Sequence, residues 1–229
     1  MLAKRIIGVV MIENGYVVRR VGWKTASIIG QPRTTIKFLQ DWDVDEIFFI
    51  NVGEKEDRDT MTRILHQAVD QCFIPITVGG GISSLEEASH FIKEGADKIV
   101  IGRNATKGLC QDICQKYGKQ ALTISVDENH EERCKELHNY EWSFGDLVIN
   151  DKSRDGKAEG LNTDLAENSR RFTDSPIILM GGTRNYQCIS EALSEECIDA
   201  VAVGNLFHFK EVSAKLAKQE CKSMGVNVR

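Results

Sequence analysis

The chain has 229 residues, enough to bury one substantial hydrophobic core. Its formal net charge of −5 argues against nucleic acid as the main partner, because such binding usually rests on a basic face. No apolar run is long enough to span a membrane, and the first twelve residues, MLAKRIIGVVMI, lack a cleavage site and lead directly into a strand pattern. We therefore expect a cytoplasmic globular protein.

Short runs rich in β-branched residues alternate with helical patterns along the whole chain. The apolar runs predict strands at Arg5–Ile12, Glu46–Val52, Pro75–Gly79, Lys98–Gly102, Leu122–Asp127, Asp146–Asn150, Pro176–Met180 and Ala200–Gly204. Between and after them, amphipathic patterns predict helices at 33–41, 57–71, 84–94, 105–117, 129–142, 162–172, 185–194 and 210–223. Eight strands, each followed by a helix, predict an α/β fold of the closed (β/α)8 or TIM-barrel type, in one domain spanning residues 1–229. A doubly wound sheet is the main alternative, but it rarely has eight such regular units in so short a chain.

Two local features add detail to this fold. Asn14 and Gly15 lie between apolar runs, which is typical of a two-residue hairpin turn, so we expect the first strand to continue into a small ribbon above the barrel. Seven cysteines are scattered through the chain, and no set of histidines and cysteines has metal-ligand spacing. We expect reduced thiols and neither a metal nor a cofactor.

The segment IPITVGGGISSLEEASHFIKEGADKIVIG, residues 74–102, runs from a strand into three glycines and then a helix. Glycines let a backbone approach a ligand closely, and a helix amino terminus offers unpaired N–H groups, so a bound phosphate is one interpretation. A tight turn without a ligand is the other. The pattern recurs 102 residues later, in the pairs Gly79 and Gly181, Gly80 and Gly182, Asp97 and Asp199, and Gly102 and Gly204. We interpret the repeat as two half-barrels, which favours two phosphate sites across the barrel mouth and a substrate phosphorylated at both ends.

Several motifs of the chain resemble one known family. They are MLAKRII, DEIFFINV, RDTM, IPITVGGGI, GADKIVIG, SRDG, PIILMGG, LFHFKE and the terminal MGVNVR. Together they run essentially from end to end and closely resemble the cyclase subunit of imidazole glycerol phosphate synthase, the HisF family of histidine biosynthesis. The resemblance implies a lyase-type cyclase that works with a glutaminase subunit, from which ammonia passes through the barrel to a bis-phosphorylated nucleotide precursor of the ribulose type. It also implies two catalytic aspartates, ending strands 1 and 5, because ring closure needs one group to donate a proton and another to remove one.

The chain departs from this family pattern at the end of the first strand. Asp127 is present at the end of the fifth strand, but Met11 stands at the strand 1 position, and a thioether cannot titrate. Glu13 lies two residues further along and is expected to point into the ribbon. Three more mouth positions differ from the aspartate, asparagine and serine of the family, and these are Asn51, Gly102 and Met180.

The other site residues follow from the same motifs. Asp155 in SRDG is the second predicted catalytic residue. The predicted substrate-binding residues are Arg19, Gly81, Gly102, Arg103, Asn150, Gly156, Gly182, Gly204 and Asn205. Arg103 either adds a bidentate contact to a phosphate or faces solvent, and both interpretations stay open. We expect His208 to pack in the core rather than to catalyse.

A ring of four charged residues closes the ammonia entrance of the family at the amino-terminal ends of the strands. The matching residues here are Arg5, Glu46, Lys98 and Asp146. The resemblance places the glutaminase partner at this face. An equal alternative is a plug of ion pairs that only stabilises the barrel floor.

Three functions remain open. The first is an ordinary cyclase with Asp127 acting alone, although losing one of two proton-transfer groups typically costs on the order of 10²–10⁴ in rate. The second is a divergent paralogue that delivers ammonia for modification of an amino sugar in surface-polysaccharide biosynthesis. The third is a non-catalytic scaffold that binds a phosphorylated ligand and activates a glutaminase. The altered mouth favours the second or the third.

Overall fold

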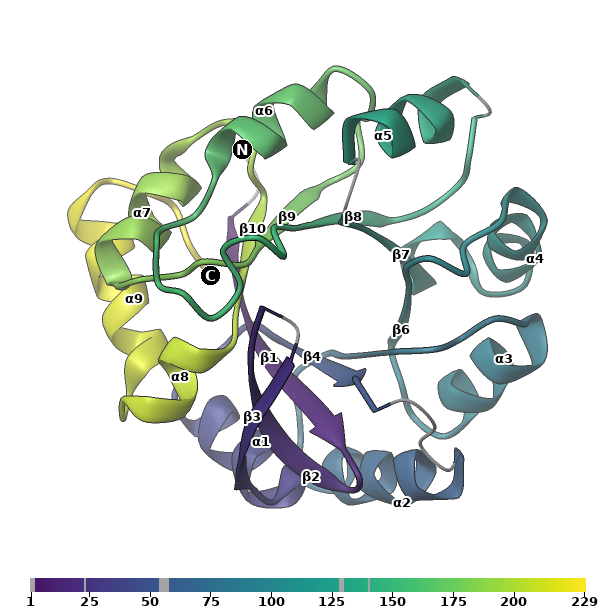
Figure 1. Cartoon of the computed structure of the whole chain (residues 1–229), viewed down its shortest axis with the longest axis horizontal. Helices are drawn as coiled ribbons and strands as arrows, with labels where there is room; N and C mark the ends of the chain where they lie inside the picture. Colours follow the sequence, from purple (N-terminus) through teal and green to yellow (C-terminus); the bar gives the residue numbers. More distant parts are fainter. Residues whose placement is uncertain (1–2, 23, 54–57, 128–129, 140) are drawn as a thin grey trace.

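The computed structural model describes residues 3–22, 24–53, 58–127, 130–139 and 141–229. Its barrel strands are β1 (Arg5–Glu13), β4 (Glu46–Asn51), β5 (Ile76–Gly79), β6 (Lys98–Ile101), β7 (Leu122–Val126), β8 (Asp146–Asn150), β9 (Ile177–Met180) and β10 (Ala200–Val203). These strands are parallel to their barrel neighbours in chain order, and β10 pairs with β1 to close the barrel (Figure 1). The closed barrel confirms the predicted (β/α)8 fold, and each predicted strand lies within one residue of its expected ends.

Helices surround the barrel (Figure 1). They are α1 (Pro32–Asp41), α2 (Arg58–Val69), α3 (Leu85–Lys93), α4 (Lys107–Tyr117), α5 (His130–Asn139), α6 (Thr163–Arg170), α7 (Tyr186–Ser194), α8 (Asn205–Phe209) and α9 (Ser213–Ser223), with a short 3-10 turn at Lys119–Ala121. Side-chain caps explain several starts: Thr106 Oγ1 accepts from the Leu109 N–H at 3.3 Å, and Asn185 Oδ1 accepts from the Cys188 N–H at 2.9 Å.

Two predicted helices differ from the structure. The segment predicted as one helix at 210–223 contains only α9, which a break separates from the short helix α8. Val212 in this break has φ = 54°, a left-handed conformation through which a right-handed helix cannot continue. The helix predicted at 129–142 is shorter, because Glu141 with φ = 48° lies beyond its end. Residues 57, 129 and 140 of the predicted helices lie outside the described residues.

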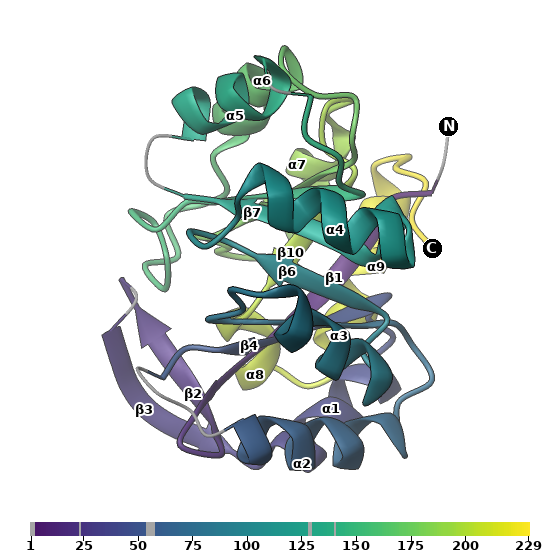
Figure 2. The same cartoon turned by 90° about the vertical axis from the view of Figure 1, so that its right-hand side faces the viewer.

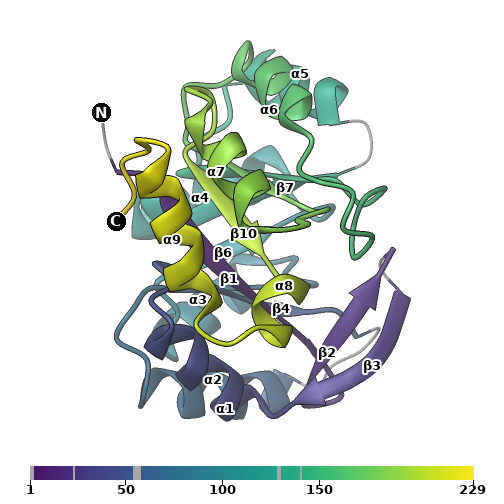
Figure 3. The ribbon, with the colours of Figure 1, turned by 90° about the vertical axis from the view of Figure 1, so that its left-hand side faces the viewer.

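A three-stranded ribbon extends from the first barrel strand. Asn14 and Gly15 have φ values of 50° and 81°, and Glu13 pairs with Tyr16, which confirms the predicted two-residue turn. The ribbon strands are β2 (Tyr16–Val21) and β3 (Lys24–Gly30), of which β3 was not expected from the sequence. Figures 2 and 3 show the ribbon at one end of the barrel and both chain termini at the opposite end.

The two half-barrel repeats are visible in the backbone, with a register that differs from the sequence interpretation. Gly80 and Gly81 have φ values of 100° and 81°, and Gly181 and Gly182 have 103° and 87°. The equivalent glycines are therefore 101 residues apart, not 102, so Gly79 corresponds to Met180. The 102-residue spacing applies to β6 and β10, because the connection between α7 and β10 is one residue longer than the equivalent connection between α3 and β6.

The barrel interior is a separate apolar cluster. Its residues are all buried on the inner face of the sheet and its ribbon. They are Ile7, Val9, Met11, Val18, Phe48, Val148, Ile178, Met180, Ala200 and Ala202. A larger cluster packs the outer face of the barrel against the helices. The interior between the two ends of the barrel is thus mostly apolar, and the buried hydroxyl groups of Thr77 and Thr123 are polar exceptions.

The described part of the chain has neither a membrane-spanning helix nor a group of metal-ligating side chains. None of its helices has the length and apolar character needed to cross a membrane. Nor do three or more histidine, cysteine, aspartate or glutamate side chains gather there in a way that could hold a metal ion.

Candidate functional site

Two adjoining cavities open at the mouth of the barrel, which is formed by the carboxyl ends of its strands. The larger cavity, of about 540 Å³, lies over β4 to β8. The smaller cavity, of about 180 Å³, lies over β1, β9 and β10. Met180 lines both cavities, so its side chain stands at the boundary between them.

The larger cavity contains the aspartate predicted to be catalytic. Asp127 directly follows β7, and its Oδ2 forms an ion pair with Nζ of Lys152, two residues beyond the end of β8. Both side chains line the cavity and are largely shielded from solvent, with 25% and 18% of their surfaces exposed. Lys152 was not predicted from the sequence. The segment NDKSRDG places this lysine close behind a strand end, which is the signal that could have identified it.

Asn150 is the last residue of β8 and also lines the larger cavity. Its side chain is buried, with 4% exposed, and its Oδ1 has no hydrogen-bond partner within the described residues. A buried amide oxygen without a partner is costly unless a ligand or water supplies a donor. The predicted substrate-binding role of Asn150 is thus compatible with its position.

The glycine-rich turn after β5 forms the outer wall of the larger cavity. A side chain at Gly81 would meet nothing within 4 Å, so this turn leaves open space beside its backbone. Asn104 Nδ2 donates to the carbonyl oxygens of Gly81 and Ile82 at 3.1 and 3.2 Å, which fixes the turn. Gly102 and Arg103 line the cavity, so the arginine, though exposed, belongs to its wall.

The smaller cavity brings together the remaining predicted residues. Those that line it are Arg19, Asp155, Gly156, Gly182, Gly204 and Asn205. A Cβ at Gly156 would lie 2.7 Å from the Arg20 carbonyl oxygen, and a Cβ at Gly182 would lie 2.4 Å from that of Gly160. Only glycine permits these close approaches, which draw the β8–α6 loop over the cavity.

Contacts around the smaller cavity hold the ribbon in place. Asn205 Nδ2 donates to the Arg20 carbonyl oxygen at 3.1 Å, so this side chain, predicted to bind substrate, contacts the ribbon. The Gly22 N–H donates to the Asp155 carbonyl oxygen at 3.0 Å. The Arg19 guanidinium lies 5.6 Å from the centre of the Phe209 ring. The ribbon therefore forms part of the mouth.

Met11 occupies the strand 1 position in the wall of the smaller cavity. It is 8% exposed and packs in the interior cluster, as does Met180 at 7%. Glu13 lies at the hairpin end of β1 and lines neither cavity. His208 Nε2 donates to the Val9 carbonyl oxygen at 2.8 Å, and burial lowers the pKa of His208, which keeps its imidazole neutral and holds α8 against β1.

The barrel floor, at the amino-terminal ends of the strands, carries a closed ring of charges. Arg5 contacts Glu46 at 3.1 Å and Asp146 at 2.9 Å. Lys98 contacts the same two carboxylates at 3.1 and 2.9 Å. Thr77 Oγ1 adds a hydrogen bond to Glu46 at 2.9 Å. The structure thus brings the four predicted gate residues together, and their role as a gate stays a prediction.

Electrostatics within the ring favour the charged state of its members. Burial alone would raise the pKa of Asp146, but Arg5 and Lys98 outweigh that effect and hold it below the ordinary value of 3.8. Burial likewise opposes the charge of Arg5, yet Asp146 and Glu46 raise its pKa above the ordinary value. Buried charges of this kind are tolerated only while all partners remain in place.

Comparison with known proteins places the chain among enzymes of one pathway. The family model described as histidine biosynthesis protein matches residues 5–213. The imidazole glycerol phosphate synthase subunit HisF of Flavobacterium johnsoniae is 30% identical over 100% of both chains. HisF of Thermotoga sp. is 31% identical over 100% of this chain and 98% of its own length, and the putative subunit hisF2 of Vibrio vulnificus is 29% identical over 100% and 92%. These matches confirm the resemblance seen in the motifs, and the chain belongs to the histidine biosynthesis protein family, as a divergent HisF-like member.

Proposed function

We propose that this chain is the synthase subunit of a glutamine-dependent system: a glutaminase docks at the barrel floor, and its ammonia reacts at the mouth with a phosphorylated substrate. The observation that carries the proposal is the closed ring of charges beneath an apolar barrel interior, in a chain related over its full length to HisF subunits. Ammonia is neutral and small, so it enters an apolar interior at far lower cost than the ammonium ion does. The floor and the interior therefore suit delivery of ammonia.

The mouth has the features that a phosphorylated substrate requires. The larger cavity offers Arg103 and the open turn at Gly81 to one phosphate, while Asp127 is placed for proton transfer. The smaller cavity offers a second phosphate the backbone at Gly204, where an added Cβ would meet only Val9 at 3.9 Å. Because the two cavities adjoin at Met180, a substrate phosphorylated at both ends can span them.

A second candidate is a paralogue that passes ammonia on for modification of an amino sugar. Met11 and Met180 favour it, because two thioethers line the mouth where the family resemblance leads us to expect an aspartate and a serine. A substrate bound beside them loses two polar contacts, so selection for a different substrate accounts for the change. A scaffold that only activates the glutaminase is the non-catalytic form of the same candidate.

One experiment separates these functions. The purified chain is given ammonium chloride and the bis-phosphorylated ribulosyl precursor, and formation of the imidazole product is followed with and without the cognate glutaminase. Turnover that Asp127→Asn abolishes supports the cyclase. Absence of turnover, together with co-purification and stimulation of the glutaminase, supports the paralogue or the scaffold. If neither turnover nor association occurs, the proposed function is wrong.

A further inference from the structure

The contact between Lys152 and Asp127 joins the ends of two neighbouring barrel strands inside the larger cavity. Asp127 follows β7 and Lys152 follows β8, strands that pair in register from Thr123 and Asp146 to Val126 and Ile149. The pairing of the two strands therefore brings the backbone at Asp127 and at Lys152 to neighbouring places at the barrel mouth. Both face a cavity large enough for a substrate, unlike the exposed ion pairs on the helices.

A third polar group completes this part of the cavity. Asn150 lies between the pair and the barrel interior, at the end of β8, with its Oδ1 buried and without a partner among the described residues. Such an oxygen accepts an N–H or O–H from whatever occupies the cavity. Lys152, Asp127 and Asn150 can thus serve as an acid, a base and a hydrogen-bond acceptor in one cavity, and all three lie at the ends of the adjacent strands β7 and β8.

We propose that Lys152 supplies the second proton-transfer group of this mouth, so that a lysine–aspartate couple replaces the pair of carboxylates of which Met11 has removed one. The inference rests on the proposed function, because it assigns roles in a reaction of ammonia with a carbonyl group. Lys152 acts as the acid, Asp127 as the base, and Asn150 Oδ1 holds the nitrogen that is being incorporated.

The proton balance of this step closes within the couple. Ammonia adds to the carbonyl carbon and gives a carbinolamine, which must then lose water. The Asp127 carboxylate removes a proton from the nitrogen while the Lys152 ammonium gives one to the departing hydroxyl group, so the C–O bond breaks, C=N forms and water leaves. Asp127 is then a neutral acid beside a neutral amine, and one proton transfer between them restores the ion pair. No net proton is consumed.

The other cations of the cavity cannot fill this role. Arg20 and Arg103 line the same cavity, but a guanidinium stays protonated in proteins and so donates no proton to a leaving group. A lysine ammonium, in contrast, can give up a proton and become a neutral amine. The protonated carboxyl group of Asp127 can then return a proton to that amine. This difference between lysine and arginine provides the test.

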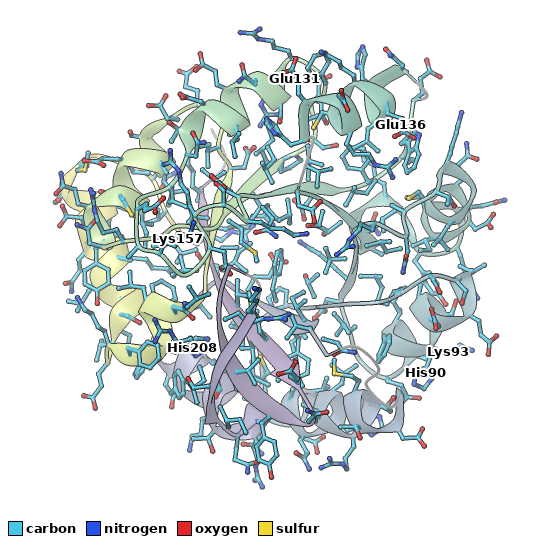
Figure 4. The ribbon with its side chains drawn as sticks, in the orientation of Figure 1. His90, Lys93, Glu131, Glu136, Lys157 and His208 are labelled. Atoms are coloured by element: carbon cyan, nitrogen blue, oxygen red, sulfur yellow. The ribbon has the colours of Figure 1, made fainter. Side chains whose placement is uncertain are left out.

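The test measures product formation from the ribulosyl precursor with ammonium chloride as the nitrogen source, so that no glutaminase is required. Lys152→Gln removes the charge, Lys152→Arg keeps the charge beside Asp127 but removes the proton donor, and Lys157→Gln is the matched control. Lys157 is an exposed lysine of the same loop (Figure 4). It is absent from the lining of both cavities. Thermal unfolding establishes that each variant is folded, and if Lys152→Gln fails to fold, Lys152→Arg alone carries the test.

We expect both Lys152 variants to lose on the order of 10²–10⁴ in kcat with KM little changed, and Lys157→Gln to match the wild type. A Lys152→Arg variant with wild-type kcat overturns the inference, because charge alone then suffices. A wild-type protein without turnover is a different result: it overturns the cyclase reaction, and the proton couple assigned to that reaction falls with it.

Discussion

The floor and the mouth of this barrel match the family resemblance to different extents. At the floor, the four charged side chains expected from the resemblance form a closed ring with contacts of 2.9 to 3.1 Å. At the mouth, Met11 and Met180 stand where polar side chains were expected, and Lys152 pairs with Asp127. Under the proposed function, the partner that supplies ammonia constrains the floor, whereas the substrate alone constrains the mouth. The contrast therefore supports our proposal of a chain that keeps the ammonia source of the family and differs in the acceptor.

The largest effect is expected from removing the proton acceptor of the mouth. Asp127→Asn keeps the shape of the side chain but cannot take up a proton, so ammonium-dependent turnover should fall on the order of 10²–10⁴-fold. Asp174→Asn is the control, since Asp174 is exposed and lines neither cavity. Equal rates for the two variants would show that the mouth does not use Asp127 as a base.

Breaking the floor should affect stability rather than chemistry. Glu46→Gln leaves Arg5 and Lys98 with one carboxylate between them in a buried ring, which should lower the free energy of unfolding by about 3–5 kcal/mol. Chemical denaturation measures this change, with the exposed Glu159→Gln as the unaffected control.

The same floor variant distinguishes a gate from a plug. If the ring is a gate, Glu46→Gln should change turnover that uses glutamine while turnover that uses added ammonium stays the same. If the two rates change in parallel, the ring is only a structural plug, and the alternative left open by the sequence is correct.

A smaller effect is expected from restoring the first carboxylate. Met11→Asp introduces a titratable group into the wall of the smaller cavity, and we expect turnover of the ribulosyl precursor to rise by about tenfold. The double variant Met11→Asp/Lys152→Gln should turn over faster than Lys152→Gln alone, because the restored carboxylate should recover part of the rate lost with the lysine. No gain in either background would mean that the other mouth residues already exclude this precursor.

The smallest effect is the response of the floor to acid. The folded-state pKa of Asp146 lies below 3.8 because Arg5 and Lys98 outweigh the cost of burial. Its contribution to stability is therefore complete above that ordinary value and is lost as the pH falls through the lower folded pKa. The unfolding free energy of the wild type should decline over this acidic range, and Asp146→Asn should lack that part of the decline. An identical pH dependence of both proteins would argue against a charged Asp146.

Much of the fold was predictable because buried parallel strands are apolar throughout. The runs at Glu46–Asn51 and Ala200–Val203 show this pattern directly, and Asn14 and Gly15 identify a tight turn by their tolerance of positive φ. The break before α9 was missed because Val212 is a residue type that rarely adopts the left-handed conformation it has here. Strand β3 was not predicted, and its pairing with β2 contains two shifts of register.

The site was only partly predictable, because a family motif identifies the residues that match it and not the contacts that other residues make in the folded chain. Asp127 and Asn150 could be identified from strand ends, and the structure places both in the larger cavity. Lys152 could not, since a lysine in a loop is usually solvated, and only the pairing of β7 with β8 brings it to Asp127. The one-residue shift between the repeats was hidden for a similar reason: the number of residues in the α7–β10 connection is not fixed by the repeat.

The rate of glutamine hydrolysis by the cognate glutaminase, measured as this chain is added, tests the central claim most directly. A retained ammonia source predicts a stable complex and a rate that rises until the two chains are equimolar, in the wild type and in Lys152→Arg alike, because the mouth is not needed for docking. A glutaminase that neither binds the chain nor changes its rate would contradict the account, whatever the mouth turns out to bind.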